Sequence, residues 1–304
     1  MADLTHRRHL PVLLAVAAAA VGCGGDGEPS GATRPDGTTT TTALVGPARP
    51  APGSPVLERA IERTGVPAGA VVLDMAGKPR VVGPLRADRA WSTIKVPLLV
   101  AYLDLRGGAA KLTPSERAAA TQMITVSANA PANRFFLALA GAKGGVRGGA
   151  RAVERVLRRG GDDRTRVTAR PPDGLRTFTW LGQTVWRLAD GARWHRALVL
   201  GRVAADADTR FVLGLMRRVT GSDWGLRAAV PASEPLAYKV GLGATPGGAI
   251  TAEQYGIVGS GDDACVIGIV ARAGDEDGAK DAVTRIAKAA VRPAAGCGPA
   301  RARG

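Results

Sequence analysis

The spacing of apolar residues divides the chain after residue 54 into a mainly helical part and a strand-rich end. Up to about residue 219, apolar positions recur mostly at helical spacing, interrupted near the start by two strand-like runs, 68–73 and 80–82, with Gly77 near the turn between them. We predict helices over residues 55–64, 92–105, 114–127, 132–139, 150–159, 188–199 and 205–219, and a loop over 164–178.

The pattern changes near residue 236, where apolar residues alternate or run together between Gly, Pro and Asp turns. Residues 236–242, 249–258 and 264–271 predict three antiparallel strands, and residues 276–291 predict a closing amphipathic helix. One sheet fed from both ends of the chain satisfies this order of elements. We therefore predict an α+β fold, in which helices flank an antiparallel five-stranded sheet and an all-helical subdomain is inserted.

The first residues read as an export signal rather than as part of a packed core. Arg7 and Arg8 precede an apolar run over 10–22, which is shorter than the about 20 residues that a membrane-spanning helix needs and fits a signal peptide. Small residues before Cys23 resemble the bacterial lipobox, in which the cysteine is lipidated, although Ala20 stands where leucine is usual. An ordinary cleaved signal with an incidental Cys23 is the alternative.

Residues 24–53 are rich in Gly, Pro and Thr and hold few residues able to build a core, so we expect a disordered tether. The predicted organisation is a lipoprotein signal peptide over 1–22, a tether over 23–53, a folded domain over 54–297 and a flexible tail over 298–304. The expected location is the outer face of the cell membrane, where a lipid on Cys23 would hold the domain.

The chain is strongly basic, with a net charge of +15 and a pI near 10.9. For an exported protein, the acidic neighbours to expect are anionic lipid head groups and wall polymers rather than nucleic acid. A basic surface that is simply solvated is an equal alternative, because Arg is scattered among Ala and Gly. We expect a monomer that binds no nucleic acid.

Ser92 and Lys95 form the only S-x-x-K pattern after Cys23. Residues three apart on a helix are neighbours, so this spacing sets a lysine amine beside a serine hydroxyl. A serine hydroxyl becomes a good nucleophile only when a base removes its proton, and lysine is such a base when burial or a nearby cation lowers its pKa. Taken alone the pattern is weak, because serine also caps helices and lysine also lies on surfaces.

Two further motifs follow in order along the chain. Ser127-Ala128-Asn129 ends a predicted helix, and Lys239-Val240-Gly241 lies on the first strand of the C-terminal group. The trio S-x-x-K, S-D-N and K-T-G is typical of class A β-lactamases and penicillin-binding proteins. From residue 55 to about 291, the sequence resembles that family in these motifs and in the order of its elements.

The resemblance implies a chemical role for three of the matching residues. Ser92 would be the nucleophile that becomes acylated, and Lys95 would be the base that activates it, directly or through water. Ser127 would be the hydroxyl that passes a proton to the leaving nitrogen.

The resemblance also implies a substrate-binding role for four residues. The Asn129 amide would hold an amide carbonyl of the substrate, and Lys239 would bind its carboxylate and keep the Lys95 amine less basic. Gly241 would let the substrate lie along the strand without a Cβ clash, and the backbone N–H of Leu242 would be an oxyanion donor.

Three departures from the family pattern weaken the expected turnover. Val240 replaces the hydroxyl residue of K-T-G, and Ala128 replaces the Asp of S-D-N. Class A enzymes carry a Glu on a loop that positions the deacylating water, whereas the matching stretch here, 166–172, has proline at that place. An acyl-enzyme would form, but its hydrolysis lacks an evident base.

The resemblance implies a serine hydrolase without a cofactor, and the predicted signal and Cys23 imply that it is exported and lipid-anchored. It would act through a Ser92 acyl-enzyme on a β-lactam or on an acyl-D-amino-acid peptide of peptidoglycan, with weak deacylation. The alternative is a catalytically impaired protein of the same fold that binds or regulates in the cell envelope. Val240 and the proline favour this alternative, and the intact Ser92, Lys95 and Ser127 favour the hydrolase.

Cys265 and Cys297 are the two cysteines left after Cys23, and an oxidising exported compartment allows them to pair. We predict a disulfide that ties the C-terminal tail to a strand, with two free thiols as the alternative. His195 is the one histidine after Cys23, so neither a Ser-His-Asp triad nor a zinc cluster can be drawn, and we expect it to pack or to lie on the surface. No metal site is predicted.

Overall fold

The sheet of this protein is built from both ends of its folded part. A computed structural model describes residues 53–174 and 177–297. The predictions for the signal peptide, for Cys23, for almost all of the tether and for the tail over 298–304 lie outside the described residues. Within them, β1 (Ala68–Asp74) and β2 (Pro79–Val82) precede the helical block, and β5 (Leu236–Ala244), β6 (Ile250–Val258) and β7 (Cys265–Ala273) follow it.

These five strands form one antiparallel sheet in the order β2-β1-β7-β6-β5, which confirms the predicted α+β fold with its five-stranded sheet. Strand β7 joins the two ends of the chain, because it pairs with β1 on one side and with β6 on the other. Strand β5 lies at one edge of the sheet, so one side of it is left open to other parts of the molecule.

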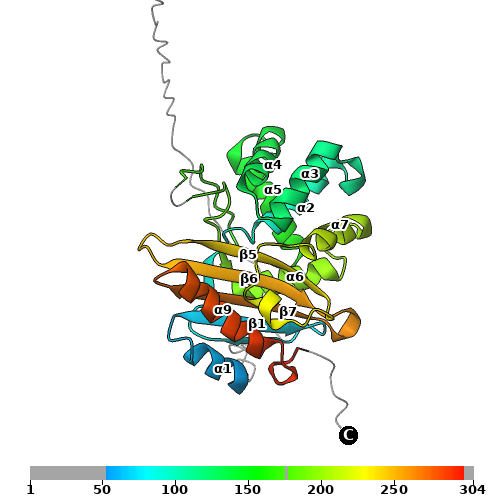
Figure 1. Cartoon of the computed structure of the whole chain (residues 1–304). Helices are drawn as coiled ribbons and strands as arrows, with labels where there is room; N and C mark the ends of the chain where they lie inside the picture. Colours follow the sequence, from blue (N-terminus) through cyan, green and yellow to red (C-terminus); the bar gives the residue numbers. More distant parts are fainter. Residues whose placement is uncertain (1–52, 175–176, 298–304) are drawn as a thin grey trace, which may run out of the picture. The chain divides into compact units, whose positions relative to one another are not determined.

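Strand β1 is buried on both faces, and its alternation sorts its side chains between two cores. Val71 and Leu73 belong to one hydrophobic cluster, and Ala70 and Val72 belong to the other. This division follows from the period of two in a strand, which points successive side chains to opposite faces. The sheet is therefore the middle layer of three (Figure 1).

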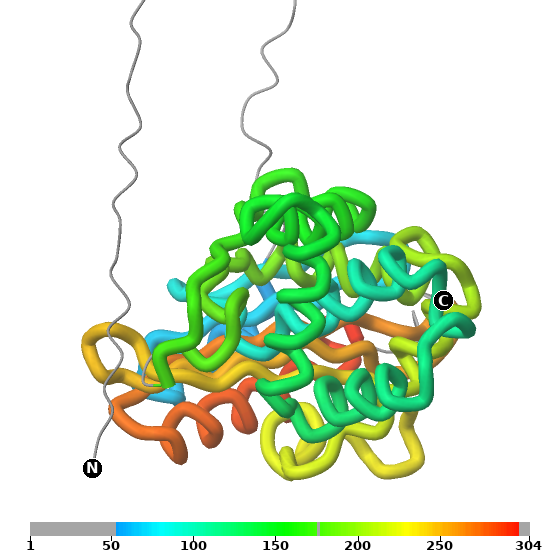
Figure 2. The backbone as a smooth tube through the Cα atoms, turned by 90° about the horizontal axis from the view of Figure 1, so that it is seen from above, coloured from blue at the N-terminus to red at the C-terminus, as the bar shows by residue number. Residues whose placement is uncertain are grey.

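One face of the sheet is covered by α1 (Pro55–Glu62) and α9 (Glu276–Ala290), with the short α8 (Leu226–Ala229) packed against α9. The other face carries α6 (Leu188–Val199), which contacts β1, β6 and β7. The helical subdomain continues this layer through α2 (Lys95–Arg106), α3 (Pro114–Thr125), α4 (Asn129–Ala142), α5 (Val146–Arg159) and α7 (Asp206–Met216). Figure 2 shows these helices lying over the strands when the molecule is seen from above.

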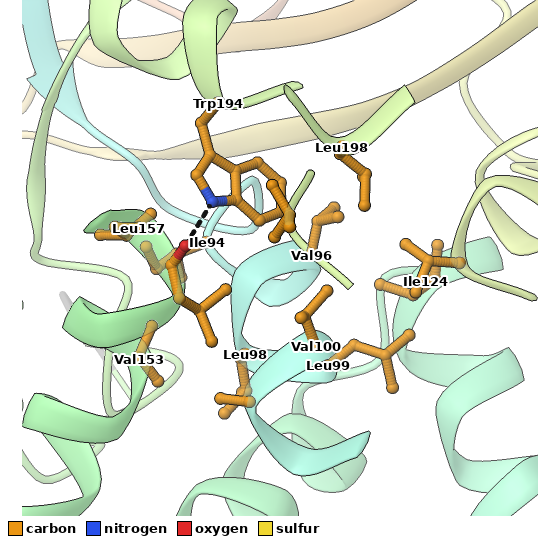
Figure 3. Close-up of a cluster of buried hydrophobic side chains, with 14 of the residues drawn as sticks. Ile94, Val96, Leu98, Leu99, Val100, Ile124, Val153, Leu157, Trp194 and Leu198 are labelled. Atoms are coloured by element: carbon orange, nitrogen blue, oxygen red, sulfur yellow. Dashed lines mark hydrogen bonds between the residues drawn. The ribbon is translucent and has the colours of Figure 1, made fainter. Parts of the chain in front are cut away.

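Helix α2 lies at the centre of the helical layer, because its apolar residues are buried on all sides. Val96, Leu98, Leu99 and Val100 are buried around its axis, against side chains from α3, α5 and α6 (Figure 3). A helix that is apolar all round is one that a larger fold encloses. The first residue of α2 is Lys95, so the fold fixes the position of that lysine firmly.

Several element boundaries differ from those the sequence predicts. Helix α2 begins at Lys95 rather than at Ser92, and α3 ends at Thr125, which leaves Ser127 in a loop. Gly148 and Gly149 lie inside α5 rather than before it. A Cβ on Gly149 would lie only 3.1 Å from the Cα of Ala140 on α4. These glycines allow α4 and α5 to pack closely.

Some short elements have no clear signal in the sequence. Strands β3 (Ala87–Arg89) and β4 (Val185–Arg187) form a separate two-stranded sheet, and α8 is also unpredicted. Three 3₁₀ turns complete the description, at η1 (Ala109–Lys111), η2 (Gly261–Asp263) and η3 (Pro293–Ala295). A run of three or four residues is too short for its period to be recognised.

Cys265 and Cys297 are joined by a disulfide, with their Cα atoms 5.4 Å apart. Both cysteines are buried, and the bond fastens the end of the described chain to the start of β7. Across residues 53–174 and 177–297, no helix combines the length and the apolar character that crossing a bilayer requires.

Candidate active site

Ser92 lies in a tight turn between β3 and α2 that two other segments hold in place. The N–H of Ala90 donates to the carbonyl of Thr184 at 2.8 Å, and the N–H of Trp91 donates to that of Gly182 at 2.9 Å. Trp91 has a φ of +44°, a conformation that side chains rarely adopt, so the turn is bent sharply just before the serine. Ser92 is half-buried and reaches the surface of a cavity.

Gly241 on β5 holds the other side of this turn. A Cβ on Gly241 would lie 2.8 Å from the carbonyl oxygen of Ala90 and 3.2 Å from the Cβ of Trp91. The structure thus explains why glycine is required at this position in a way that the resemblance does not. Its missing side chain lets the turn that carries Ser92 approach the edge strand.

Lys95 is fully buried beneath the site, and its amine is held by one acceptor from the α3–α4 loop and one from the first residue of α4. The Nζ donates to the backbone carbonyl of Ser127 at 2.5 Å and to the Oδ1 of Asn129 at 2.7 Å. Burial, and then the nearby charge of Lys239, lower the pKa of Lys95 well below its ordinary value. The amine is not hydrogen bonded to the Ser92 hydroxyl in this structure.

Lys239 comes from β5 and approaches the same loop from the opposite side. It is fully buried, and its Nζ donates to the Ser127 hydroxyl at 2.8 Å and to the carbonyl of Val240 at 3.1 Å. Burial lowers the pKa of Lys239 from 10.5 to about 7. Two lysines with lowered pKa values therefore converge on one serine.

The Ser127 hydroxyl lies between the two amines. Its oxygen is 2.8 Å from the Nζ of Lys239 and 3.4 Å from that of Lys95. Ser127 has a φ of +58°, which turns its side chain toward the lysines and away from the end of α3. A hydroxyl has two acceptor lone pairs and one proton to donate. Because both lone pairs accept from N–H groups of the two amines, the hydroxyl proton is left to point elsewhere.

A cavity of about 350 Å³ joins the predicted residues at the open edge of β5. Of the residues singled out in the sequence, the structure places Ser92, Ser127, Asn129, Lys239 and Leu242 on its walls, together with Val240. Lys95 lies under the floor of the cavity, and Gly241 faces the Ser92 turn. Residues of three separate segments, 92–95, 127–129 and 239–242, thus meet in one place.

The loop that matches the class A deacylation loop contributes nothing to these walls. Residues 166–172 include no acid, and Pro171 and Pro172 are exposed. The loop is fastened to α4 by Asn133, whose Nδ2 donates to the carbonyl of Phe178 at 3.3 Å and whose Oδ1 accepts from the N–H of Trp180 at 3.1 Å. The fold thus keeps an anchored loop here whose stretch 166–172 carries no carboxylate.

Other residues of the site escaped the sequence reasoning. The cavity is also lined by Trp224, by Glu276 and Lys280 of α9, and by the stretch 219–222. Glu276 and Lys280 form an ion pair at 2.5 Å. Their spacing of four on a predicted helix is visible in the sequence, but only the packing of α9 beside the edge of β5 brings them to the cavity.

Glu253 on β6 lies beneath the Ser92 turn. It is fully buried and accepts a hydrogen bond of 3.3 Å from the Thr93 hydroxyl. Burial, and then the nearby Asp88, raise its pKa well above the ordinary value and so favour the neutral carboxyl. An acid within the apolar run of a predicted central strand was a signal that could have singled it out.

His195 packs in the core, in agreement with one of the two expectations for it. It is fully buried, its ring stacks on that of Tyr255 with centroids 4.9 Å apart, and burial lowers its pKa to about 4. No group of three His, Cys, Asp or Glu side chains suited to a metal occurs in the part of the chain that the structure describes.

A second cavity, of about 570 Å³, is larger than the one at β5 but lacks a comparable set of groups. Its walls are mainly apolar, with Met75, Val199, Leu200, Leu213 and Ile257 among them. We therefore place the candidate site at the smaller cavity, where Ser92, the two lysine amines and the Asn129 amide converge.

Comparison with known proteins identifies the fold. No protein-family model and no curated protein matches the chain. Among solved structures, an ancestral class A β-lactamase (GNCA) matches 78% of this chain and 98% of its own with a TM-score of 0.62 and 21% identity. A β-lactamase from Desulfarculus baarsii matches 77% of this chain and 94% of its own with a TM-score of 0.61 and 18% identity. One from Xanthomonas campestris pv. campestris matches 79% of this chain and 96% of its own with a TM-score of 0.61 and 19% identity. The chain thus has the serine β-lactamase-like fold, as predicted.

Proposed function

We propose that this protein is a serine hydrolase of the β-lactamase and penicillin-binding type, which becomes acylated on Ser92. Its substrates would be β-lactams or acyl-D-amino-acid peptides of peptidoglycan. The observation that carries the proposal is the meeting of two buried lysines on Ser127, at a cavity whose wall also holds Ser92 and Asn129. Burying two amines without a carboxylate partner costs stability, so their retention calls for a functional reason.

In the acylation step, the Ser92 oxygen attacks the carbonyl carbon of the substrate while its proton passes to the Lys95 amine. Lys95 suits this role because burial and the charge of Lys239 favour its neutral form. The backbone N–H groups of Ser92 and Leu242 would donate to the oxyanion, and Asn129 would hold the substrate amide from the opposite wall.

Collapse of the tetrahedral intermediate breaks the carbon–nitrogen bond and leaves an ester on Ser92. The leaving nitrogen takes up the proton of the Ser127 hydroxyl, which is replaced by a proton from Lys95 or Lys239. The contacts of 2.8 Å and 3.4 Å provide both routes. Because both amines occupy acceptor sites of this hydroxyl, its proton is directed into the cavity.

Release of the ester needs a water molecule and a base, and here the site is poorly equipped. No acid stands in 166–172, and Glu276 is the one carboxylate among the residues that line the described cavity, where it is paired with Lys280. Slow deacylation follows, so we expect a penicillin to stay bound for much longer than in a class A enzyme.

A second function is favoured by Val240. Its side chain lines the cavity but offers no hydroxyl to a substrate carboxylate, which leaves recognition to Lys239 and Lys280. A protein that keeps the cavity and has lost turnover would bind or regulate in the cell envelope.

Labelling with a fluorescent penicillin separates the two functions. We expect the wild type to form a covalent band that survives denaturation, and Ser92→Ala to form none. Ser222→Ala is the matched control, because Ser222 lines the same cavity and its backbone carbonyl, not its side chain, accepts from Tyr238. If the wild type forms no band at high probe concentration, the hydrolase proposal is refuted and the binding or regulatory function is favoured.

Export and lipid anchoring at Cys23 belong to the same proposal. We expect the mature protein on the outer face of the membrane, as a monomer that does not bind nucleic acid. Metabolic labelling with a fatty acid should mark the wild type and spare Cys23→Ala. Release of an unlabelled, shortened wild-type protein into the medium would instead point to an ordinary cleaved signal.

A further inference from the structure

Five cationic side chains surround a groove of about 300 Å³ between α1 and α9, on the sheet face that these helices cover. Arg59 comes from α1 and Arg63 caps its C-terminal end, Arg285 and Lys288 come from α9, and Arg292 follows α9. The groove is distinct from the candidate active site, since the two share no lining residue.

The cations of this groove have no ion-pair partner within the described part of the protein. None of the five side chains forms an ion pair there, and all five are exposed. The acids of the same helices, such as Glu58, Glu62 and Asp281, do not line the groove.

The spacing within each helix makes this concentration of charge costly. Arg59 lies four residues before Arg63 at the end of α1, and Arg285 lies three residues before Lys288 on α9 and shortly before Arg292 beyond it, so like charges are neighbours at each helix. Such neighbours repel each other, and an anion bound between them would offset the repulsion. The groove is therefore suited to an anionic ligand.

The floor of the groove narrows the class of anion. It is made of Val56, Ala60 and Ala289, so the cationic rim encloses an apolar surface. Guanidinium groups bind phosphate oxygens through paired hydrogen bonds, whereas an apolar floor suits a hydrocarbon part. A phosphate group with an apolar neighbour is the chemistry of a phospholipid head group.

The position of α1 in the chain favours a lipid in a membrane over a free polymer. Helix α1 is the first element of the described domain and begins directly after the predicted tether of residues 24–53. A random coil of that length has a root-mean-square span of about 30 Å, so an anchored domain would stay within reach of the bilayer surface. We propose that the α1–α9 groove binds anionic phospholipid head groups at the membrane surface.

The test is a vesicle-binding measurement on the full chain carrying Cys23→Ser, so that lipidation does not hold the protein to the bilayer. Vesicles of phosphatidylcholine alone are compared with vesicles that also contain phosphatidylglycerol. We expect preferential binding to the anionic vesicles, weakened by added salt. Arg59→Gln/Arg63→Gln/Arg285→Gln should lower the partition coefficient by roughly 100-fold, since each surface charge contributes about a fivefold factor.

The matched control removes the same net charge elsewhere. Arg147, Arg151 and Arg155 of α5 are exposed and form no ion pair with described residues, so Arg147→Gln/Arg151→Gln/Arg155→Gln should leave most of the binding. Equal losses for the two triple variants would show that only net charge matters and would overturn the proposal.

Two further outcomes decide the source of the phosphate and keep the proposals apart. Binding of soluble poly(glycerol phosphate) without binding to anionic vesicles would overturn a membrane ligand in favour of a wall polymer. Thermal melting shows whether each variant folds, independently of catalysis. Penicillin labelling at Ser92 is a separate measurement. The lipid-binding proposal can therefore be refuted without refuting the hydrolase proposal, and the reverse also holds.

Discussion

Replacing Lys239 with methionine should stabilise the domain while it removes acylation. Lys239 is fully buried, and no carboxylate pairs with it among the described residues. Burial lowers its pKa from 10.5 to about 7, so the unfolded chain binds more protons than the folded one between these pH values. The free energy of unfolding contributed by this group therefore rises with pH across that window and is lowest below pH 7.

The size of the effect follows from the same difference. A pKa lowered from 10.5 to about 7 costs about 5 kcal/mol of stability at and below neutral pH, and almost none above pH 10.5. Methionine removes this cost but leaves the Ser127 hydroxyl and the Val240 carbonyl without their donor, which costs about 2 kcal/mol. We expect Lys239→Met to gain about 3 kcal/mol at pH 7, or roughly 10 °C in Tm.

The assay is thermal melting of wild type and variant at pH 7 and at a pH near 10.5. The gain at pH 7 should vanish at the higher pH and turn into a small loss. Lys280→Met is the matched control, because this lysine lines the same cavity but is partly exposed and paired with Glu276, so its replacement should give no large gain. An equal Tm difference at both pH values would refute the reasoning, since it would show that the charge on Lys239 carries no cost.

The same variant tests the function of the charge. Lys239 lowers the pKa of Lys95, and it donates to the Ser127 hydroxyl. Its loss should let Lys95 hold its proton more tightly and so slow the activation of Ser92. We expect no penicillin labelling of a protein that is more stable than the wild type, which a merely structural role for Lys239 does not predict.

Three further changes test other parts of the site. Val240→Thr supplies the missing hydroxyl at the cavity wall and should raise the penicillin acylation rate about tenfold, which is the value of one hydrogen bond to a carboxylate. An unchanged acylation rate would show that the substrate carboxylate is held elsewhere. Gly241→Ala puts a Cβ 2.8 Å from the Ala90 carbonyl oxygen, so it should lower the free energy of unfolding by about 1–3 kcal/mol. It should also slow acylation at least tenfold by shifting the Ser92 turn, and a normal labelling rate would contradict the close approach. Cys265→Ala/Cys297→Ala opens a loop with a sequence separation of 32 and should lower the free energy of unfolding in urea by about 3–4 kcal/mol, and no loss would mean that the bond does not form.

The periodicity of the sequence was enough to find the large elements and their order. Helix α6 has the predicted bounds, and strands β1, β5, β6 and β7 agree with the prediction to within two residues at each end. The reason is that burial on one face leaves a local period of 3.6 or 2, which needs no knowledge of the neighbours. Short elements such as β3 and β4 bury too few residues to leave such a period.

The motifs also selected the residues of the cavity, but their chemistry depends on contacts between distant segments. Ser92 and Lys95 are close in the sequence, whereas Lys239 reaches them only because β5 is the edge strand beside the α3–α4 loop. Burial lowers the pKa of both lysines, and the nearby charge of Lys239 lowers that of Lys95 further; the spacing of the motifs expresses neither effect. The role of Gly241 in admitting the Ser92 turn is likewise a property of the packed molecule.

The sequence by itself determined the layers of the fold and the identity of the groups that a serine hydrolase needs. Only the tertiary structure decided that both buried amines meet at the Ser127 hydroxyl, that the buried Glu253 lies beneath the Ser92 turn, and that five cations without an ion pair to described residues line one groove between α1 and α9. The physical reason is that periodicity records which positions are buried, whereas electrostatic energies depend on distances between residues far apart in the chain.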